Sequence, residues 1–160
     1  MRSIKPFFLL YIASVLVCPA WAQTDPSVAA AAASSEDLVR LSWKASNEGN
    51  IDALNKLYDV TIAAYDAEAR LQAGRLTGFP PRDQAESYRI MDDVATVMFI
   101  KAETLMHRGK NDEARVLFEQ VSAQYPWAQS WDPSRGSFWS IREKAQASIK
   151  TMSGQAPGQE

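Results

Sequence analysis

The sequence predicts an all-α protein, made of antiparallel helical hairpins that are closed by a C-terminal capping helix. Between residues 35 and 152 the apolar residues recur every three or four positions and almost never alternate, which is the spacing of helices and not of strands. Single glycines and Gly-Pro clusters separate these periodic runs, and such residues end helices and form turns. We therefore expect five helices and no sheet.

The first two expected helices are separated by Gly49. The first begins at Ser34 or Ser35, where a hydroxyl group accepts hydrogen bonds from free backbone amides, and it ends at Gly49. Asn50 is the expected cap of the second helix, which continues to about Arg75. The apolar stripe of this second helix consists of Leu54, Leu57, Tyr58, Thr61 and Tyr65.

The third expected helix follows the segment TGFPPRD, whose glycine and prolines cannot lie inside a helix. Asp83 is its expected cap, and Gly109 closes it. Its residues Tyr88, Met91, Ala95, Met98, Ala102 and Leu105 step by three and four, so they share one face.

The last two expected helices lie on either side of a tryptophan-rich segment. The fourth helix runs from about Asn111 to Gln124 and ends before Pro126. The fifth runs from about Ser137, its expected cap, to Met152. Phe138 and Ile141 of this fifth helix are expected to cover the open end of the helical stack.

The N-terminus has the layout of a secretory signal peptide. Arg2 and Lys5 precede a short apolar run, and small residues lead to an expected cleavage before Gln23. This organisation predicts a signal peptide (1–22), a flexible leader (23–34), a helical domain (35–152) and a disordered tail (153–160) in a secreted or periplasmic protein. Cys18 leaves a lipid anchor open as the less favoured alternative, because the preceding Val17 is larger than a lipidation site prefers.

Composition narrows the classes of partner and cofactor. Without Arg2 and Lys5 the mature chain keeps 15 of its 17 basic residues against 19 acidic ones, a net charge of about −4. This charge gives no footprint for nucleic acid, and the apolar run of residues 7–17 is shorter than the ~20 residues of a membrane span. With no cysteine in the mature chain and one histidine, we expect no metal site and no cofactor.

An internal repeat connects the two halves of the helical region. EGNIDALNKLYD parallels RGKNDEARVLFE, with Gly49 matching Gly109 at an offset of 60 residues. Around Gly109, the small residues Ala102 and Ala114 and their large partners Leu105 and Phe118 occupy the positions that let two antiparallel helices pack closely. This pattern, ended by Pro126, resembles the tetratricopeptide repeat (TPR) family, whose unit is a helix-turn-helix of about 34 residues. The resemblance implies a right-handed stack of one clear and one degenerate unit.

The resemblance also implies a binding surface and a class of function. Members of the family bind partners on the face lined by the first helix of each unit, so we expect a peptide or an envelope protein to be held there, without catalysis. The alternative is that Phe99 and Trp43 of this surface pack against the leader or a neighbouring helix. The expected groove residues are Val39, Trp43, Asn47, Phe99, Glu103, Met106 and His107.

The segment YPWAQSWDPSRGSFW admits two interpretations. Its indoles are expected to form a lid over the edge of the core, since tryptophans bury large areas. Alternatively they form a platform for a glycan, in an accessory protein or a small hydrolase similar to a β-glucanase. Catalysis is not expected, because the side chains of the adjacent pair Asp92 and Asp93 diverge on a helix. The platform residues would be Trp127, Trp131, Asp132, Arg135 and Trp139.

Overall fold

The computed structural model describes residues 33–154, so the predicted signal peptide, Cys18, most of the leader and most of the tail lie outside the described residues. The first two helices are α2 (Ser35–Asn47) and α3 (Ile51–Ala73). Their expected caps are confirmed. The Ser34 hydroxyl accepts a hydrogen bond from the backbone N–H of Asp37 at 3.1 Å, and the Asn50 side chain accepts one from the N–H of Ala53 at 3.0 Å.

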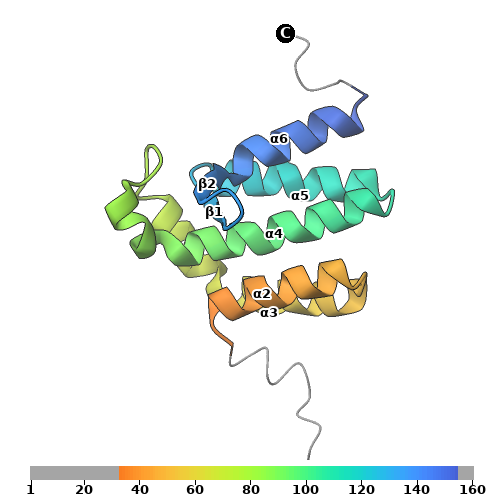
Figure 1. Cartoon of the computed structure of the whole chain (residues 1–160), viewed down its shortest axis with the longest axis horizontal. Coiled ribbons are helices and arrows are strands. Elements are labelled where there is room, and N and C mark those ends of the chain that lie inside the picture. The colour runs from red at the N-terminus through yellow and green to blue at the C-terminus, as the bar shows by residue number, and fades with distance from the viewer. Residues whose placement is uncertain (1–32, 155–160) are drawn as a thin grey trace, which may run out of the picture.

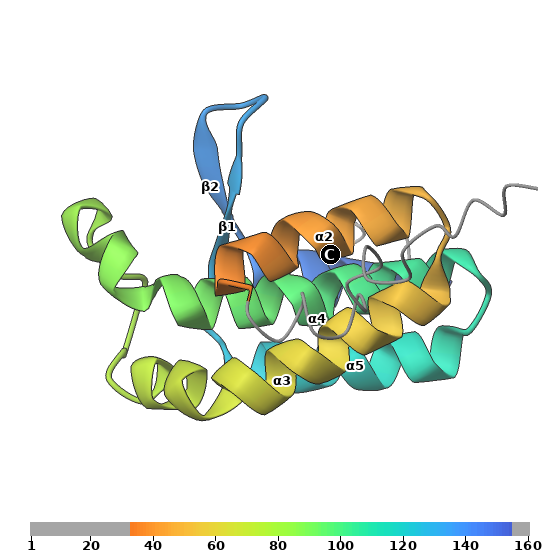
Figure 2. The same ribbon diagram turned by 90° about the horizontal axis from the view of Figure 1, so that it is seen from below.

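The helices form two layers (Figures 1 and 2). The first layer contains α2, α4 (Arg89–His107) and α6 (Ile141–Met152), with α4 between the other two. The second contains α3 and α5 (Asn111–Gln124), which lie behind α2 and α4 in the view of Figure 1. Because α4 packs against each of the other α-helices among residues 33–154, it is the central element of the described fold. Helices make up most of the described residues, which confirms the predicted predominance of helix.

The hydrophobic core forms around α4. One face of α4 joins α5, α6 and the end of α3 in the larger cluster, which contains the expected close-packing residues Ala102, Leu105, Ala114 and Phe118, all at most 4% exposed. A smaller cluster packs Ile100 of α4 against Leu38, Ala45, Leu54 and Leu57 of α2 and α3. Burial on both sides explains why the middle of α4 is an almost unbroken apolar run.

Two equivalent turns show that the 60-residue repeat extends to local geometry. Gly49 and Gly109 have φ angles of 66° and 76°, a left-handed conformation that glycine adopts without a steric penalty. The residue after each glycine donates its N–H to the same relative carbonyl, Asn50 to Ala45 at 2.9 Å and Lys110 to Leu105 at 3.0 Å. Each turn therefore ends one helix and returns the chain antiparallel to it.

The start of the third helix differs from the expected one. Residues Arg82–Tyr88 form a 3₁₀ helix, η1, and the α-helix begins only at Arg89. Asp83 does not cap it. Instead, the backbone N–H of Met91 donates to the side-chain oxygen of Gln72 in α3, at 2.9 Å. A side chain from another helix replaces the local cap, which local sequence patterns do not predict.

The prediction that the chain contains no sheet is wrong. Strands β1 (Gln129–Asp132) and β2 (Ser137–Ser140) form an antiparallel hairpin, and α6 begins at Ile141, capped by Ser140 and not by Ser137. Phe138 consequently lies on a strand and not on the capping helix. The Asp132 side chain accepts the N–H of Ser134 at 2.9 Å, and Gly136 adopts a φ of 61°, so the segment DPSRG forms a tight turn.

Candidate binding cleft

An open cleft of about 700 Å³ lies between α2, the start of α4 and the β-hairpin. We call it the α2–hairpin cleft. Helix α2 contributes Val39 and Trp43 to one wall. Strand β1 contributes all four of its residues to the opposite wall, and β2 adds Phe138 and Trp139. The cleft thus has aromatic side chains on both walls, from elements nearly ninety residues apart in the sequence.

The strand register explains how the hairpin is anchored. Directly opposed residues of an antiparallel pair share a face, so Trp139 lies with Ser130 on one face and Trp131 with Phe138 on the other. The Trp139 ring packs edge-on against Phe99 of α4, with centroids 5.2 Å apart. Trp131 and Phe138 contact each other at 5.0 Å and remain 49% and 38% exposed. Trp139 therefore attaches the hairpin to the core, and the other face stays open.

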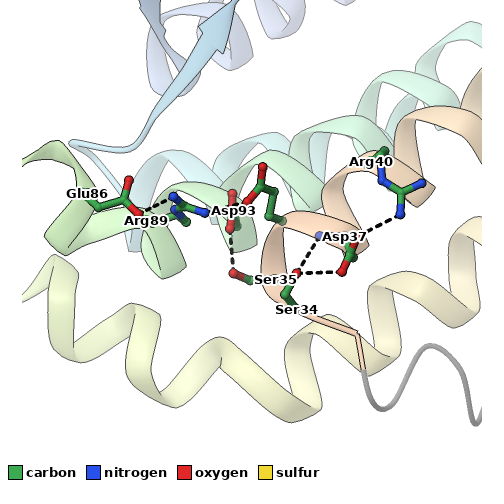
Figure 3. A network of polar contacts seen from close by, with 8 residues as sticks. Ser34, Ser35, Asp37, Arg40, Glu86, Arg89 and Asp93 are labelled. Atoms are coloured by element: carbon green, nitrogen blue, oxygen red, sulfur yellow. Dashed lines mark hydrogen bonds and ion pairs between the residues drawn. The ribbon is translucent and has the colours of Figure 1, made fainter.

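Two adjacent carboxylates of α4 each accept a hydrogen bond from one wall of the cleft. Asp92 Oδ1 accepts the backbone N–H of Gln129 in β1 at 2.9 Å, and Asp93 Oδ2 accepts the hydroxyl of Ser35 in α2 at 2.6 Å. The divergence of neighbouring side chains on a helix makes this double contact possible. Figure 3 shows the hydroxyl of Ser35 directed at Asp93. The pair thereby fixes the position of both walls relative to α4.

Burial raises the pKa of both carboxyls. Loss of hydration raises the pKa of Asp92 to about 7, the N–H of Gln129 lowers it, and the charge of Asp93 raises it. Burial likewise raises the pKa of Asp93 to about 6, opposed by the bond from Ser35 and by the charge of Arg89. Both acids therefore titrate near neutral pH.

Ion pairs surround the rim of the cleft. The Arg89 guanidinium contacts Glu36 of α2 at 2.6 Å and also pairs with Glu86 of η1 (Figure 3). Arg40 pairs with Asp37, one turn earlier in α2, at 2.8 Å. These side chains are largely exposed, so each pair adds little to stability. Their main effect is that both arginines of the cleft already have carboxylate partners.

The structure separates the groove residues expected from the sequence. Val39 and Trp43 line the cleft, whereas the other five do not. The expectation for Phe99 is wrong: it is 2% exposed, because Trp139 covers it. Asn47 and His107 are exposed at the far ends of α2 and α4, and Glu103 and Met106 are half-buried.

The three tryptophans of the segment have different surroundings. Trp139 acts as the expected lid, whereas the half-exposed Trp131 does not. Trp127 contacts Phe79 edge-on at 5.5 Å and does not line the cleft. Of the platform residues, Trp131, Asp132 and Trp139 line the cleft, and Arg135 reaches it only through its ion pair with Asp132 at 3.5 Å.

Sequence reasoning missed Asp92 and Asp93 as site residues, although two adjacent acids within an apolar helical run were a usable signal.

Within residues 33–154, no three His, Cys, Asp or Glu side chains are grouped to hold a metal ion. No helix in that range combines the length and apolar character of a membrane span. Comparison with protein-family models, with curated proteins and with solved structures finds no match to this chain.

Proposed function

We propose that the protein is a noncovalent binding module that holds an extended peptide segment of another protein in the α2–hairpin cleft. The observation that carries the proposal is the edge of β1. Within the described residues β1 pairs only with β2, so its other edge is unpaired, and all four of its residues line the cleft. An unpaired strand edge offers backbone donors and acceptors to an incoming extended chain.

The direction of the backbone groups supports this mode of binding. The N–H of Gln129 bonds to Asp92 in α4, so it points away from β2. Because backbone groups of a strand alternate with a period of two, the N–H and C=O of Trp131 point the same way, toward the cleft. Asp92 already accepts the first free N–H along this edge, that of Gln129, so the next backbone groups open to a ligand are the N–H and C=O of Trp131.

The aromatic walls supply the apolar part of the interaction. Trp43 on α2 and Trp131 on β1 face the same cleft, and the indole of Trp131 is half exposed. Burying such rings against a ligand contributes roughly 25 cal/mol for each Å² of apolar surface removed from water. Main-chain hydrogen bonds then orient the segment, and the rings select its side chains.

Selection from a random dodecapeptide library displayed on phage tests the proposal. We expect clones that bind the wild-type protein and lose binding to Trp43→Ala and Trp131→Ala. Leu71→Ala is the matched control, since Leu71 is 59% exposed on α3 and does not line the cleft. N-methylation of the peptide nitrogen opposite Trp131 should abolish binding, and methylation of the next nitrogen should not. Clones that ignore both tryptophan substitutions would contradict the proposal.

A saccharide is the second candidate occupant, because the exposed Trp131 ring lies next to Asp132 in the same cleft. If a sugar stacks on Trp131, adding soluble glucans should shift the tryptophan fluorescence, whereas adding peptides should not. Hydrolysis would additionally require two carboxyls facing each other across the bond to be cleaved. Asp93, the neighbour of Asp92, instead bonds to Ser35.

A further inference from the structure

The α2–hairpin cleft carries more carboxylates than cations. Its lining includes five acids, Glu36, Glu86, Asp92, Asp93 and Asp132, and two bases, Arg40 and Arg89. The excess is local, and it lies between aromatic walls, not on an open polar surface. Such a combination complements a positively charged ligand.

Neither base forms a hydrogen bond or ion pair with the acids at the floor of the cleft, although the charge of Arg89 acts on Asp93. Arg89 is engaged by Glu36 and Glu86, and Arg40 by Asp37. The direct partners of Asp92 and Asp93 are neutral groups, the N–H of Gln129 and the hydroxyl of Ser35. Two neighbouring, partly buried carboxylates with only neutral hydrogen-bond donors are costly when both are ionised, and a ligand cation would relieve that cost.

The aromatic walls favour a cation as well. Trp43 and Trp131 present indole rings to the cleft, and indole is the side chain that attracts a nearby ammonium or guanidinium most strongly. The protein already contains one contact of this kind, with the Lys101 ammonium 3.9 Å above the ring of Tyr58. Carboxylates at the floor and indoles on the walls thus recognise the two parts of a long basic side chain, its charged head and its apolar stem.

We infer that the segment held by the α2–hairpin cleft is basic, and that a lysine or arginine side chain of this segment reaches between Trp43 and Trp131 to Asp92 and Asp93. The inference rests on the proposed function and adds the charge of the occupant to it. The peptide backbone pairs with the edge of β1, and the side chain that points into the cleft carries the cation.

The acidities of the two carboxyls give this inference a pH signature. A bound cation favours ionised Asp92 and Asp93, so binding releases protons wherever these carboxyls are protonated in the free protein. Their pKa values of about 7 and about 6 place this release between about pH 5 and pH 8. The charged groups that face Asp93 are Arg89 of α4, whose charge lowers its pKa, and Glu36 of α2 and Glu86 of η1, whose charges raise it. Affinity for a basic peptide should therefore rise with pH across this window.

Three synthetic peptides with the same alternating leucine framework test the inference. They carry lysine, glutamine or glutamate at the intervening positions, and fluorescence anisotropy measures their binding at about pH 8. We expect the lysine peptide to bind about tenfold more tightly than the glutamine peptide, and the glutamate peptide to bind least. The double variant Asp92→Asn/Asp93→Asn should lose about that tenfold preference and bind the lysine and glutamine peptides about equally.

A matched control separates local recognition from attraction by net charge. Asp112→Asn/Glu113→Gln removes the same two charges from exposed positions at the start of α5, outside the cleft. This control should keep the preference for lysine. If the double cleft variant does not fold, the wild-type protein alone decides, because its affinity for the lysine peptide must increase from about pH 5 to about pH 8 and that for the glutamine peptide must not.

The outcomes separate this inference from the proposed function. Equal binding of the lysine and glutamine peptides, both lost in Trp43→Ala, would overturn the basic occupant and leave the peptide-binding cleft intact. An equal loss of preference in the α5 control would also overturn it. Failure of all three peptides, together with a fluorescence change on adding soluble glucans, would overturn both and favour a saccharide.

Discussion

Replacing Asp92 by asparagine should stabilise the protein at neutral and alkaline pH. Burial raises the pKa of this carboxyl from about 3.8 in the unfolded chain to about 7 in the fold. The folded state therefore binds the proton more tightly than the unfolded state. It follows that Asp92 contributes stability that is complete below about pH 4 and is lost as the pH rises through about 7.

The magnitude follows from the two pKa values. A difference of about three pK units corresponds to about 4 kcal/mol at most, and local relaxation and water entry reduce this value. Asparagine cannot ionise, yet its side-chain oxygen still accepts the N–H of Gln129, which lies 2.9 Å from the Asp92 oxygen. We expect the free energy of unfolding of Asp92→Asn to exceed that of the wild type by about 2 to 4 kcal/mol at about pH 8. Below about pH 4 the difference should vanish.

Guanidinium unfolding followed by far-UV circular dichroism, repeated between about pH 4 and pH 8, measures this difference. Asp112→Asn is the matched control, because Asp112 is exposed on α5 and its removal should change stability little at any pH. If Asp92→Asn were less stable than the wild type at about pH 8, the carboxylate would be stabilising there, and the assignment of a raised pKa to burial would be refuted.

Three further predictions concern packing, turn geometry and capping. Ala114→Leu should destabilise the protein by about 1 to 3 kcal/mol in thermal unfolding, since Ala114 is fully buried between α4 and α5, whereas Ala123→Leu on the exposed side of α5 should change stability little. Gly109→Ala should lower the free energy of unfolding by about 1 to 2 kcal/mol in denaturant unfolding. An added Cβ meets no atom within 4 Å, so this cost is backbone strain alone, and an unchanged unfolding midpoint would contradict the prediction. Gln72→Leu should cost about 1 to 3 kcal/mol by leaving the N–H of Met91 without its acceptor, and amide exchange at Met91 should accelerate more than at mid-helix positions of α4.

The helices were predictable because their signals are local. A hydroxyl or amide cap at Ser34 or Asn50, a glycine at a left-handed turn and an apolar stripe all act within one or two helical turns. The late start of α4 was not predictable, since an amide of its first turn, that of Met91, is satisfied by Gln72, 19 residues earlier in the chain. The β-hairpin was missed for a different reason. Its strands have four residues each, too few for alternation to stand out beside a neighbouring helical pattern.

The sequence predicted some of the residues that line the candidate site, but not how the hairpin and α2 come together to form it. The resemblance to tetratricopeptide repeats places Val39, Trp43 and Phe99 on one open face of the first helices. In the structure the hairpin projects from the layer of α2, α4 and α6 (Figure 2), and its Trp139 packs against Phe99. The covered part of that face becomes core, and the uncovered part beside α2 becomes a cleft. No local pattern reveals this, because the hairpin and α2 are separated by most of the domain.

The contacts of the two acids explain how the cleft can hold its walls and a ligand together. Asp92 gives Oδ1 to the hairpin and Asp93 gives Oδ2 to α2, which leaves each carboxylate one further oxygen with acceptor capacity. A ligand cation placed between those oxygens strengthens the ionised state without displacing either wall. A proton does the opposite, since it turns an acceptor oxygen into a donor. In the proposed binding mode, the same two side chains therefore both position the walls of the cleft and contact the cation of the ligand.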